Sequence, residues 1–465
     1  MEARHLVARD VIASLESLLE RAGGRRRLVS ATTEVDVADP SAAVFGSRLA
    51  SDRWFCWEQP DRDGFALAAL GSAEEEVSRG PRRFADLVEG CAELVRDRVA
   101  EEPTGLPPAA GPVWVGGFAF DPLGCGVGEW SSFPPALMVL PELALVRHQE
   151  RVLLTASLVS GAGSADALSR LAARLGTLRL DAGLPMLDPA PAGHARVASA
   201  NSPESYERAV AAAVDRIRDG KLEKAVLARE VTVEASAAFD PAAIFGAVRD
   251  LFSSCFCFCC GSPEAAFLGA SPELLVRRRG AGAATVALAG STRRSADPAV
   301  DDHLGEQLLR SPKNRGEHQV VVRRIERRLR PYSVWVEAEA EPGVVKVANI
   351  QHLATPIHAQ LADPRSALEL AGLLHPTPAV GGEPHDAAMA LIEELEGLDR
   401  GWYAGPVGWM DAAEDGELCV AIRSALLRDR TAHLYVGNGI VAESDPESEL
   451  AETELKLDAL LPLLV

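Results

Sequence analysis

Four short motifs lie between residues 375 and 423, and they decide how the chain is interpreted. The first is His375-Pro376-Thr377-Pro378-Ala379-Val380-Gly381-Gly382. The others are Glu393-Glu394-Leu395-Glu396, Arg400-Gly401-Trp402-Tyr403-Ala404-Gly405 and Ala421-Ile422-Arg423. Because they follow one another within about fifty residues, they form the most informative stretch of the sequence.

The composition is that of a folded, acidic protein. The chain has 465 residues and 47% hydrophobic content, which is ample for a sizeable core. Its net charge of −20 argues against a nucleic-acid or anionic-membrane partner, because phosphate binding depends on clustered Lys and Arg. An anionic small molecule still fits, provided that a few basic residues or a metal converge at one site.

No apolar run approaches the ~18 residues that a membrane span requires. The start, Met1-Glu2-Ala3-Arg4-His5, continues into charged, helix-like sequence rather than the apolar core of a signal peptide. We therefore expect a cytoplasmic protein.

Four of the eight cysteines lie close together, at Cys255, Cys257, Cys259 and Cys260. The alternation Cys-Phe-Cys-Phe-Cys is typical of a buried strand that shows small apolar thiols on one face. A metal or redox cluster would need CxxC spacing and a second pair, so the pattern favours the buried strand.

Local patterns predict helices and strands on both sides of a break near residue 196. Helical periodicity covers residues 5–22 and ends at Gly23-Gly24, and a helix opens at Pro203 with Ser202 as its N-cap. The expected strands are 113–120, 136–141 and 151–156. A Pro/Ala/Gly-rich segment, 188–200, divides the chain into an N-terminal portion, 1–195, and a region of 196–465.

A long basic helix is expected over 317–329, and its arginines most simply form a solvated face. The sequence has no Gly-rich phosphate loop and no dinucleotide fingerprint, so nucleotide-dependent chemistry is not supported.

Taken together, the motifs of 375–423 resemble those of the chorismate-utilising enzymes, and more narrowly those of isochorismate synthases. The resemblance spans roughly 112–465 and is strongest from 196 onward. It implies an α+β fold in which large antiparallel sheets pack face to face with helices outside. It also implies the substrate chorismate, with residues 196–465 as the catalytic region.

The reaction of this family adds a nucleophile to C2 of a cyclohexadiene dicarboxylate while the C4 hydroxyl leaves, so it needs a base and an acid. Leu222-Glu223-Lys224-Ala225-Val226-Leu227 resembles the family strand whose lysine activates water, which makes Lys224 the candidate base. A lysine acts as a base near neutral pH only where its surroundings disfavour the ammonium form. By itself the segment favours a solvated lysine at a strand edge, and the other motifs of the family make Lys224 the candidate base.

Gly269-Ala270-Ser271-Pro272-Glu273-Leu274 matches the family's Ser-Pro-Glu turn, and the resemblance makes Glu273 the acid that protonates the departing hydroxyl. Such an acid needs a raised pKa, from an apolar setting or a neighbouring negative charge. Amine-transferring relatives generally lack a lysine at position 224, so Lys224 favours water over ammonia.

A magnesium site is implied by Gly316-Glu317-His318 and by the segment Glu449 to Lys456. Glu449, Glu452 and Lys456 share one helical face because they lie three and four residues apart. By resemblance, Glu317 and Glu452 ligate Mg²⁺ and Glu449 supports them. Carboxylate oxygens suit this ion, although an ordinary salt-bridged surface helix would show the same spacing. Asn314 stands where some relatives have an acidic residue.

The resemblance also assigns residues to substrate binding. Arg423 would clamp the pyruvyl carboxylate with help from Tyr403 and Lys456. His352 would orient the substrate near the departing hydroxyl, or it is a satisfied core histidine. The remaining candidates are Ala289, Gly290, Ser291, Thr355, Ala379 and Gly437.

These residues predict an isomerase, an Mg²⁺-dependent isochorismate synthase acting as a monomer. Two alternatives stay open: a salicylate synthase, which adds pyruvate elimination, and a non-catalytic chorismate-binding protein. Ala379 within His-Pro-Thr-Pro-Ala-Val favours isochorismate, because salicylate-forming relatives carry a hydroxylated residue nearby. The long portion before residue 112 is more similar to menaquinone-type than to siderophore-type enzymes.

Overall fold

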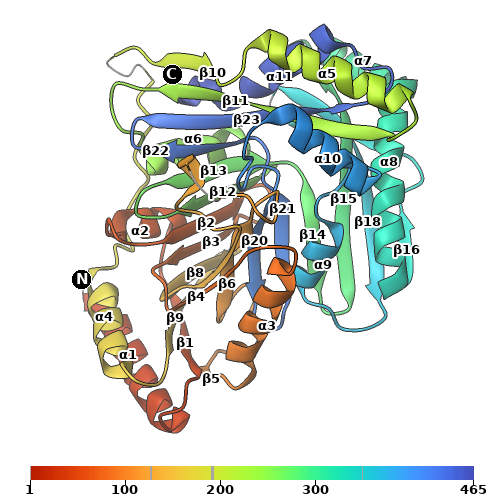
Figure 1. Cartoon of the computed structure of the whole chain (residues 1–465). Helices are drawn as coiled ribbons and strands as arrows, with labels where there is room; N and C mark the ends of the chain where they lie inside the picture. Colours follow the sequence, from red (N-terminus) through yellow and green to blue (C-terminus); the bar gives the residue numbers. More distant parts are fainter. Residues whose placement is uncertain (1, 126–127, 190–192, 348) are drawn as a thin grey trace.

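A computed structural model describes residues 2–125, 128–189, 193–347 and 349–465. Two large sheets lie at its centre, and helices cover their outer sides (Figure 1). Nearly all neighbouring strands run antiparallel; β1 (Leu28–Val35) and β5 (Val99–Glu101) form a parallel pair at one edge.

Counted over the described residues, the larger sheet has thirteen strands. Their order across the sheet is β10 (Arg196–Ser199), β11 (Lys224–Glu234), β23 (Thr431–Ile440), β22 (Ser424–Arg428), β13 (Ala266–Ser271), β12 (Phe256–Gly261), β2 (Trp54–Gln59), β3 (Phe65–Leu70), β8 (Leu143–His148), β9 (Arg151–Val159), β1 and β5, with β19 (Gly382–Glu383) paired to β11.

In the part of the chain that the structure describes, the second sheet has ten strands. Their order is β16 (Ser333–Ala338), β18 (Ile350–Leu361), β15 (Gly282–Arg293), β14 (Leu274–Arg279), β21 (Gly416–Val420), β20 (Pro406–Asp411), β6 (Val113–Phe118), β7 (Ala136–Leu140) and β4 (Glu74–Ser78), with β17 (Gly343–Val347) paired to β18. The chain passes from one sheet to the other between β13 and β14, through Ser271-Pro272-Glu273.

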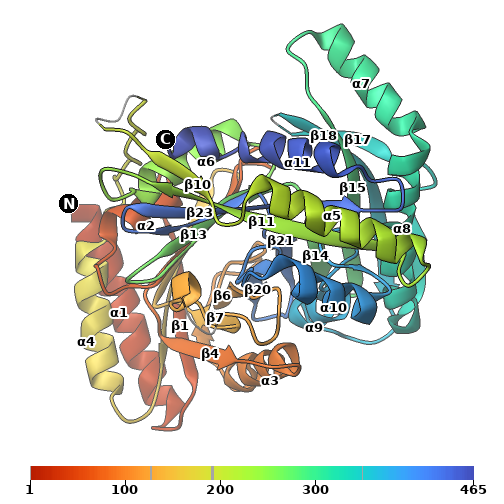
Figure 2. The same cartoon turned by 45° about the horizontal axis from the view of Figure 1, so that its top comes forward.

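The helices fall into three groups (Figures 1 and 2). Against the larger sheet pack α1 (Glu2–Ala22), α2 (Pro40–Ser47), α4 (Ser164–Thr177) and α6 (Pro241–Leu251). Against the second sheet pack α3 (Arg83–Arg96), α7 (Pro298–Arg310), α8 (Pro312–Leu329) and α9 (Ala367–Leu374). Near β11 and β23 lie α5 (Pro203–Arg218), α10 (His385–Glu396) and α11 (Pro446–Leu457). Short 3₁₀ turns are η1 (Gly128–Trp130), η2 (Arg330–Tyr332) and η3 (Leu461–Leu463).

Alternation along the strands builds two hydrophobic cores. On β2, Phe55 and Trp57 point into the core between the sheets, whereas Cys56 points toward the outer helices. On β12, Cys257 and Cys259 likewise join the outer core, while Phe258 joins the inner one. All eight cysteines are buried, which confirms the prediction of a buried strand.

Several predicted elements are confirmed. The first helix is α1, the expected strands are β6, β7 and β9, and α5 begins at Pro203. The Ser202 hydroxyl accepts a hydrogen bond from the backbone N–H of Ser205, as an N-cap should. Both sheets contain strands from either side of residue 196, and a domain boundary there stays a prediction.

The basic helix differs from its prediction in two ways. It is α8, which begins at Pro312 because Ser311 caps it, five residues before the expected start. Its arginines do not form a uniformly solvated face. Arg323 is exposed, but Arg324 is partly buried and pairs with Glu383 at 3.5 Å. This side of α8 therefore attaches the helix to β19.

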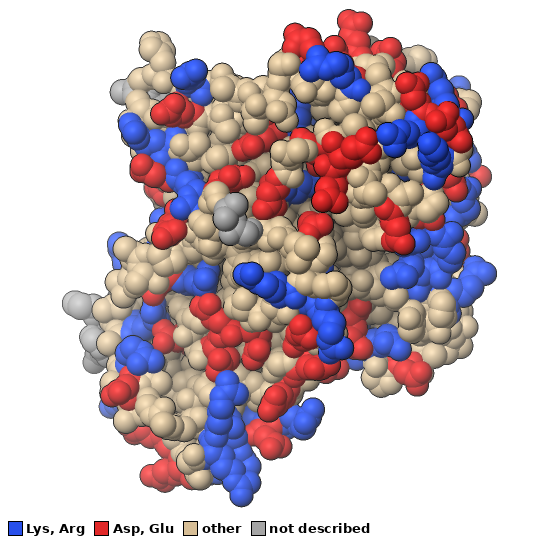
Figure 3. Space-filling view, viewed as in Figure 1, with Lys and Arg blue, Asp and Glu red and all other residues tan. Residues whose placement is uncertain are grey.

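Within the described residues, no helix combines the length and apolar character that a membrane span requires. On the face shown in Figure 3, Lys and Arg side chains are interspersed with Asp and Glu.

Candidate active site

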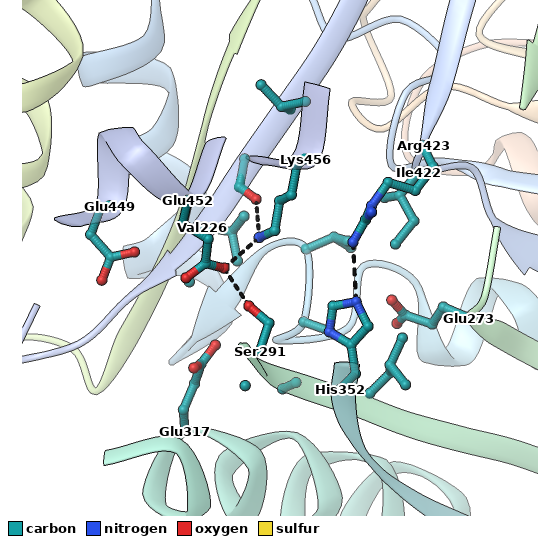
Figure 4. Close-up of a pocket in the computed structure, with 18 of the residues that line it drawn as sticks. Val226, Glu273, Ser291, Glu317, His352, Ile422, Arg423, Glu449, Glu452 and Lys456 are labelled. Atoms are coloured by element: carbon teal, nitrogen blue, oxygen red, sulfur yellow. Dashed lines mark hydrogen bonds and ion pairs between the residues drawn. The ribbon is translucent and has the colours of Figure 1, made fainter. Parts of the chain in front are cut away.

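A cavity lies where the ends of β11, β15, β18 and β23 meet α8 and α11 (Figure 4). Every described residue on its wall lies between Val226 and Lys456 in the sequence, so the N-terminal strands support the cavity without lining it. Glu273 and Glu449 lie at opposite ends of the view in Figure 4, and His352 lies beside Glu273.

The structure brings most of the predicted site residues to this one cavity. Those on its wall are Glu273, Ala289, Gly290, Ser291, Glu317, His352, Ala379, Tyr403, Arg423, Gly437, Glu449, Glu452 and Lys456. Two others, Lys224 and Thr355, lie behind the wall. Thr355 Oγ1 is hydrogen-bonded to Nε2 of the buried His318 at 2.7 Å, so it supports α8 rather than facing the cavity.

Lys224 is the first residue of β11 and is only 1% exposed. Its Nζ lies 2.8 Å from Oε1 of Glu317, which is on the cavity wall. Val226, two residues along the same face of the strand, also lines the cavity. Lys224 is therefore buried one side chain back from the cavity, with Glu317 as its counter-ion.

Gly439 makes room for this ion pair. It is the partner of Val226 on the neighbouring strand β23. A Cβ at this position would lie 2.2 Å from Glu317 Oε1 and 2.6 Å from Lys224 Cε, closer than atoms can approach without a shift. Glycine at 439 therefore leaves the Lys224 ammonium next to the cavity wall.

With Lys224 as the candidate base, Gly439→Ala is expected to lower activity by about 10²-fold, because a displacement of about 1 Å in a reacting group has an effect of that size. Steady-state kinetics would measure it. Gly316→Ala on α8 is the matched control, since a Cβ there meets nothing within 4 Å. A Gly439→Ala variant as active as this control would show that the ion pair can shift without consequence.

Glu273 lies at the crossing between the two sheets and is 3% exposed. Its backbone N–H donates to Ser271 Oγ at 3.1 Å, and its Oε1 accepts a hydrogen bond from Thr377 Oγ1 at 3.5 Å. Burial raises the pKa of Glu273 to about 8, although Lys224 and Thr377 act to lower it. The carboxyl group is therefore largely protonated at neutral pH and can donate a proton.

Arg423 and His352 form a rigid pair on the cavity wall. Arg423 Nη2 donates to His352 Nε2 at 3.1 Å. Burial, followed by the charges of Arg423 and Lys456, lowers the pKa of His352 to about 3, so this ring is neutral and accepts. Arg423 has a positive φ of 52°, an uncommon conformation for a side-chain-bearing residue. Its buried Nη1 has no hydrogen-bond partner among the described residues and is available to an anion.

Helix α11 carries two carboxylates into the cavity. Glu452 Oε1 accepts from Lys456 Nζ at 2.8 Å and from Ser291 Oγ at 2.5 Å. Burial would raise the pKa of Glu452, but Lys456 and Ser291 outweigh it and lower the pKa to about 2. Glu449 is 3% exposed and accepts from Lys313 Nζ at 3.0 Å.

The oxygen atoms of three carboxylates in this cavity are the kind of ligand that a hard divalent cation prefers. Glu317, Glu449 and Glu452 supply carboxylate oxygens to one cavity. Burial and the neighbouring charge of Glu452 raise the pKa of Glu449, a repulsion that a cation would relieve. Within the described chain these carboxylates are bonded to lysines, and no three His, Cys, Asp or Glu side chains converge at metal-ligand spacing.

A β-bulge shapes the floor of the cavity. The pairing of β15 with β18 shifts register between Ala289 and Ser291. Gly290 adopts φ +74° at this point, and an added Cβ would lie 3.1 Å from Cβ of Asn314. The bulge thus turns Ser291 toward Glu452 and brings the start of α8 against the strand.

The comparison with known families decides the class of protein. A family model described as "Chorismate binding enzyme" matches residues 13–465. The chain belongs to the chorismate-binding enzyme family.

Relatives of this chorismate-binding enzyme include two named isochorismate synthases. It is 39% identical to the salicylate biosynthesis isochorismate synthase of Pseudomonas aeruginosa, over 96% of this chain and 93% of the relative. It is 32% identical to isochorismate synthase MenF of Bacillus subtilis, over 94% and 93%. The solved structure of MenF, the menaquinone-specific isochorismate synthase of Escherichia coli, aligns with a TM-score of 0.78 at 27% identity, covering 97% of this chain and 99% of that one. The predicted α+β fold is confirmed.

Sequence reasoning missed three residues that shape the site of this chorismate-binding enzyme. Thr377 lies within the quoted His-Pro-Thr-Pro motif, yet its bond to Glu273 joins positions far apart in the chain. Gly439 lies two residues after the candidate Gly437, and the pairing of β11 with β23 places it beside Val226. Lys313 lies four residues before Glu317, a helical spacing that could have indicated a shared face.

Proposed function

We propose that the protein is an isochorismate synthase, which converts chorismate reversibly to isochorismate. Water adds at C2, the C4 hydroxyl leaves as water, and the ring double bonds shift, so the mass is unchanged. The observation that carries the proposal is Glu273, a buried acid with a pKa raised to about 8, in the same cavity as a cluster of carboxylates and an available arginine. Both relatives described above bear the name of this activity.

Glu273 and Lys224 divide the proton transfers between them. Glu273 gives its proton to the departing C4 oxygen, and its burial keeps that proton in place up to about pH 8. Lys224 takes a proton from the attacking water. Its place on the face of β11 that carries Val226, beside Gly439, supports this role.

The cations on the cavity wall fit the two carboxylates of chorismate. Arg423 offers its Nη1, while His352 fixes the rest of the guanidinium. Tyr403 stacks on Tyr435 with ring centroids 5.4 Å apart, which holds it beside the arginine. Lys456 donates to the Gly437 carbonyl at 2.9 Å and to Asn438 Oδ1 at 2.6 Å, so its ammonium is held beside Glu452.

We propose Mg²⁺ as the cofactor, held by Glu317 and Glu452 and supported by Glu449. When bound, it would supply positive charge to a substrate carboxylate. The three side chains come from α8 and α11, and both helices are fixed by contacts with strands of the site.

Glu452→Gln is expected to raise the Mg²⁺ concentration needed for half-maximal activity by about 100-fold, since a lost oxygen charge weakens a hard-cation site strongly. A magnesium titration of turnover measures this. Glu447→Gln, an exposed change on the same helix, is the control. An unchanged magnesium titration in Glu452→Gln would show that Glu452 is not a metal ligand and serves only in the salt bridge with Lys456.

The decisive experiment incubates the purified protein with chorismate and Mg²⁺, with and without ammonium, and separates the products by chromatography with mass detection. An isomer of unchanged mass, formed without ammonium and carrying heavy oxygen when heavy-oxygen water is used, supports the proposal. Salicylate with pyruvate would support the salicylate synthase alternative. Chorismate binding without any product would support a binding protein. The pathway served, the monomeric state and the cytoplasmic location stay predictions.

A further inference from the structure

Three lysines pair one to one with the three carboxylates that are proposed to hold the metal. Lys224 pairs with Glu317, Lys456 with Glu452, and Lys313 with Glu449. A divalent cation arriving alone would leave two positive charges in excess at this place. The excess is removed when an anion enters with the cation, when a lysine loses a proton, or when one lysine leaves.

Lys313 differs from the other two lysines in its freedom to move. Lys224 is 1% exposed and held beneath Gly439, and Lys456 has two further hydrogen bonds on β23. The Lys313 side chain is 36% exposed, and Glu449 is its ion-pair partner among the described residues. Lys313 and Glu317 also line a second, outer groove beside the cavity. The ammonium of Lys313 can therefore move into this groove.

The position of Lys313 shows that the carboxylates hold it in place. It is the second residue of α8, and a cation in the first turn of a helix is opposed by the helix dipole. Its Nζ lies 3.0 Å from Oε1 of the buried Glu449. This ion pair therefore holds the ammonium of Lys313 at the cavity.

We propose that Lys313 is an internal counter-cation, which holds Glu449 in the metal-free protein and which a divalent cation has to displace into the outer groove. This inference rests on the proposed magnesium site. Lys313 then sets the affinity of the site for Mg²⁺. The substrate-free protein binds Mg²⁺ more weakly than the same carboxylates would without Lys313.

The test measures Mg²⁺ binding by calorimetry in the absence of chorismate. Lys313→Met is expected to bind Mg²⁺ about tenfold more tightly than the wild-type protein, which corresponds to ~1.4 kcal/mol, because no competing ammonium remains. Its Tm without metal should fall, since Glu449 is left buried without its partner, and Mg²⁺ should restore it.

Three further variants serve as controls for this test. Lys313→Gln repeats the loss of charge in case the methionine variant folds poorly, and Lys313→Arg keeps the charge and should bind Mg²⁺ like the wild type. Lys221→Met removes an exposed lysine from the same outer groove and should change nothing. Unchanged or weaker Mg²⁺ binding in both neutral variants would overturn the inference.

Failure of the proposed function would look different. If the wild-type protein forms isochorismate with Mg²⁺ but the neutral variants gain no affinity, only the role of Lys313 is wrong. If the wild-type protein forms no isochorismate and no variant binds Mg²⁺, the magnesium site and the role of Lys313 are both wrong.

Discussion

Lys224→Ala is expected to slow isochorismate formation by about 10²- to 10⁴-fold, the range over which a positioned base contributes, while chorismate still binds. Binding should persist because Arg423 and Lys456, the proposed partners of the substrate carboxylates, do not depend on Lys224. Turnover is measured by product chromatography, and chorismate binding by calorimetry.

The same change also removes the counter-ion of Glu317, so stability needs its own control. A carboxylate left without its buried partner lowers the free energy of unfolding by several kcal/mol. The double variant Lys224→Met/Glu317→Gln removes both charges and should recover much of the lost Tm without recovering turnover. Near-normal turnover in Lys224→Ala would exclude the lysine as the base.

Glu273→Gln is expected to cause a loss of similar size in kcat, about 10²- to 10⁴-fold, because glutamine keeps the shape of the side chain but has no acidic proton. In the wild-type protein, kcat/KM should fall above about pH 8, since the folded-state pKa of Glu273 is about 8 and only the protonated form can donate. The residual activity of the variant should lack this alkaline decline.

Glu273→Gln should lower activity, but above about pH 8 it should raise the free energy of unfolding. The unfolded chain loses this proton near the ordinary pKa of 4.5, whereas the folded protein keeps it up to about 8. The folded state therefore binds more protons through this window, and the free energy of unfolding contributed by Glu273 falls as the pH rises from about 4.5 to 8. Above that window Glu273→Gln should be more stable than the wild-type protein.

A glutamate with only a structural role would change stability with pH, but its replacement would not remove the alkaline decline in kcat/KM. Denaturant unfolding at pH 6 and pH 9, set beside the pH profile of kcat/KM, separates the two roles. If Glu273→Gln retains wild-type turnover, or if the alkaline decline persists in it, the proton comes from another group.

The sequence predicted much of this molecule because its strongest signals are local. The cap at Ser202 and the alternation around Cys257 depend on neighbouring residues, and both are found as expected. The family motifs added the site residues, thirteen of which line one cavity. Local rules alone could not order the strands of two sheets, because β22 and β13 pair across more than 150 residues of chain.

What the sequence could not predict depends on contacts between distant segments. Thr355 belongs to the motif Gln351-His352-Leu353-Ala354-Thr355, but strand geometry and the bond to His318 place it behind the cavity. The arginines of α8 were expected in solvent, yet Glu383 on β19 draws Arg324 inward. The partner of Lys313 lies more than 130 residues away, so no spacing along the chain indicates it.

The N-terminal strands support the cavity without lining it, and this affects which substitutions they can accept. Strands such as β2 and β3 lie in the same sheet as β13, whose end leads into Glu273, but they place no described side chain on the cavity wall. Selection for chemistry acts on them only through packing, and many apolar sequences satisfy packing equally well. Apolar substitutions in β2 and β3 that preserve packing are therefore expected to leave the cavity wall unchanged.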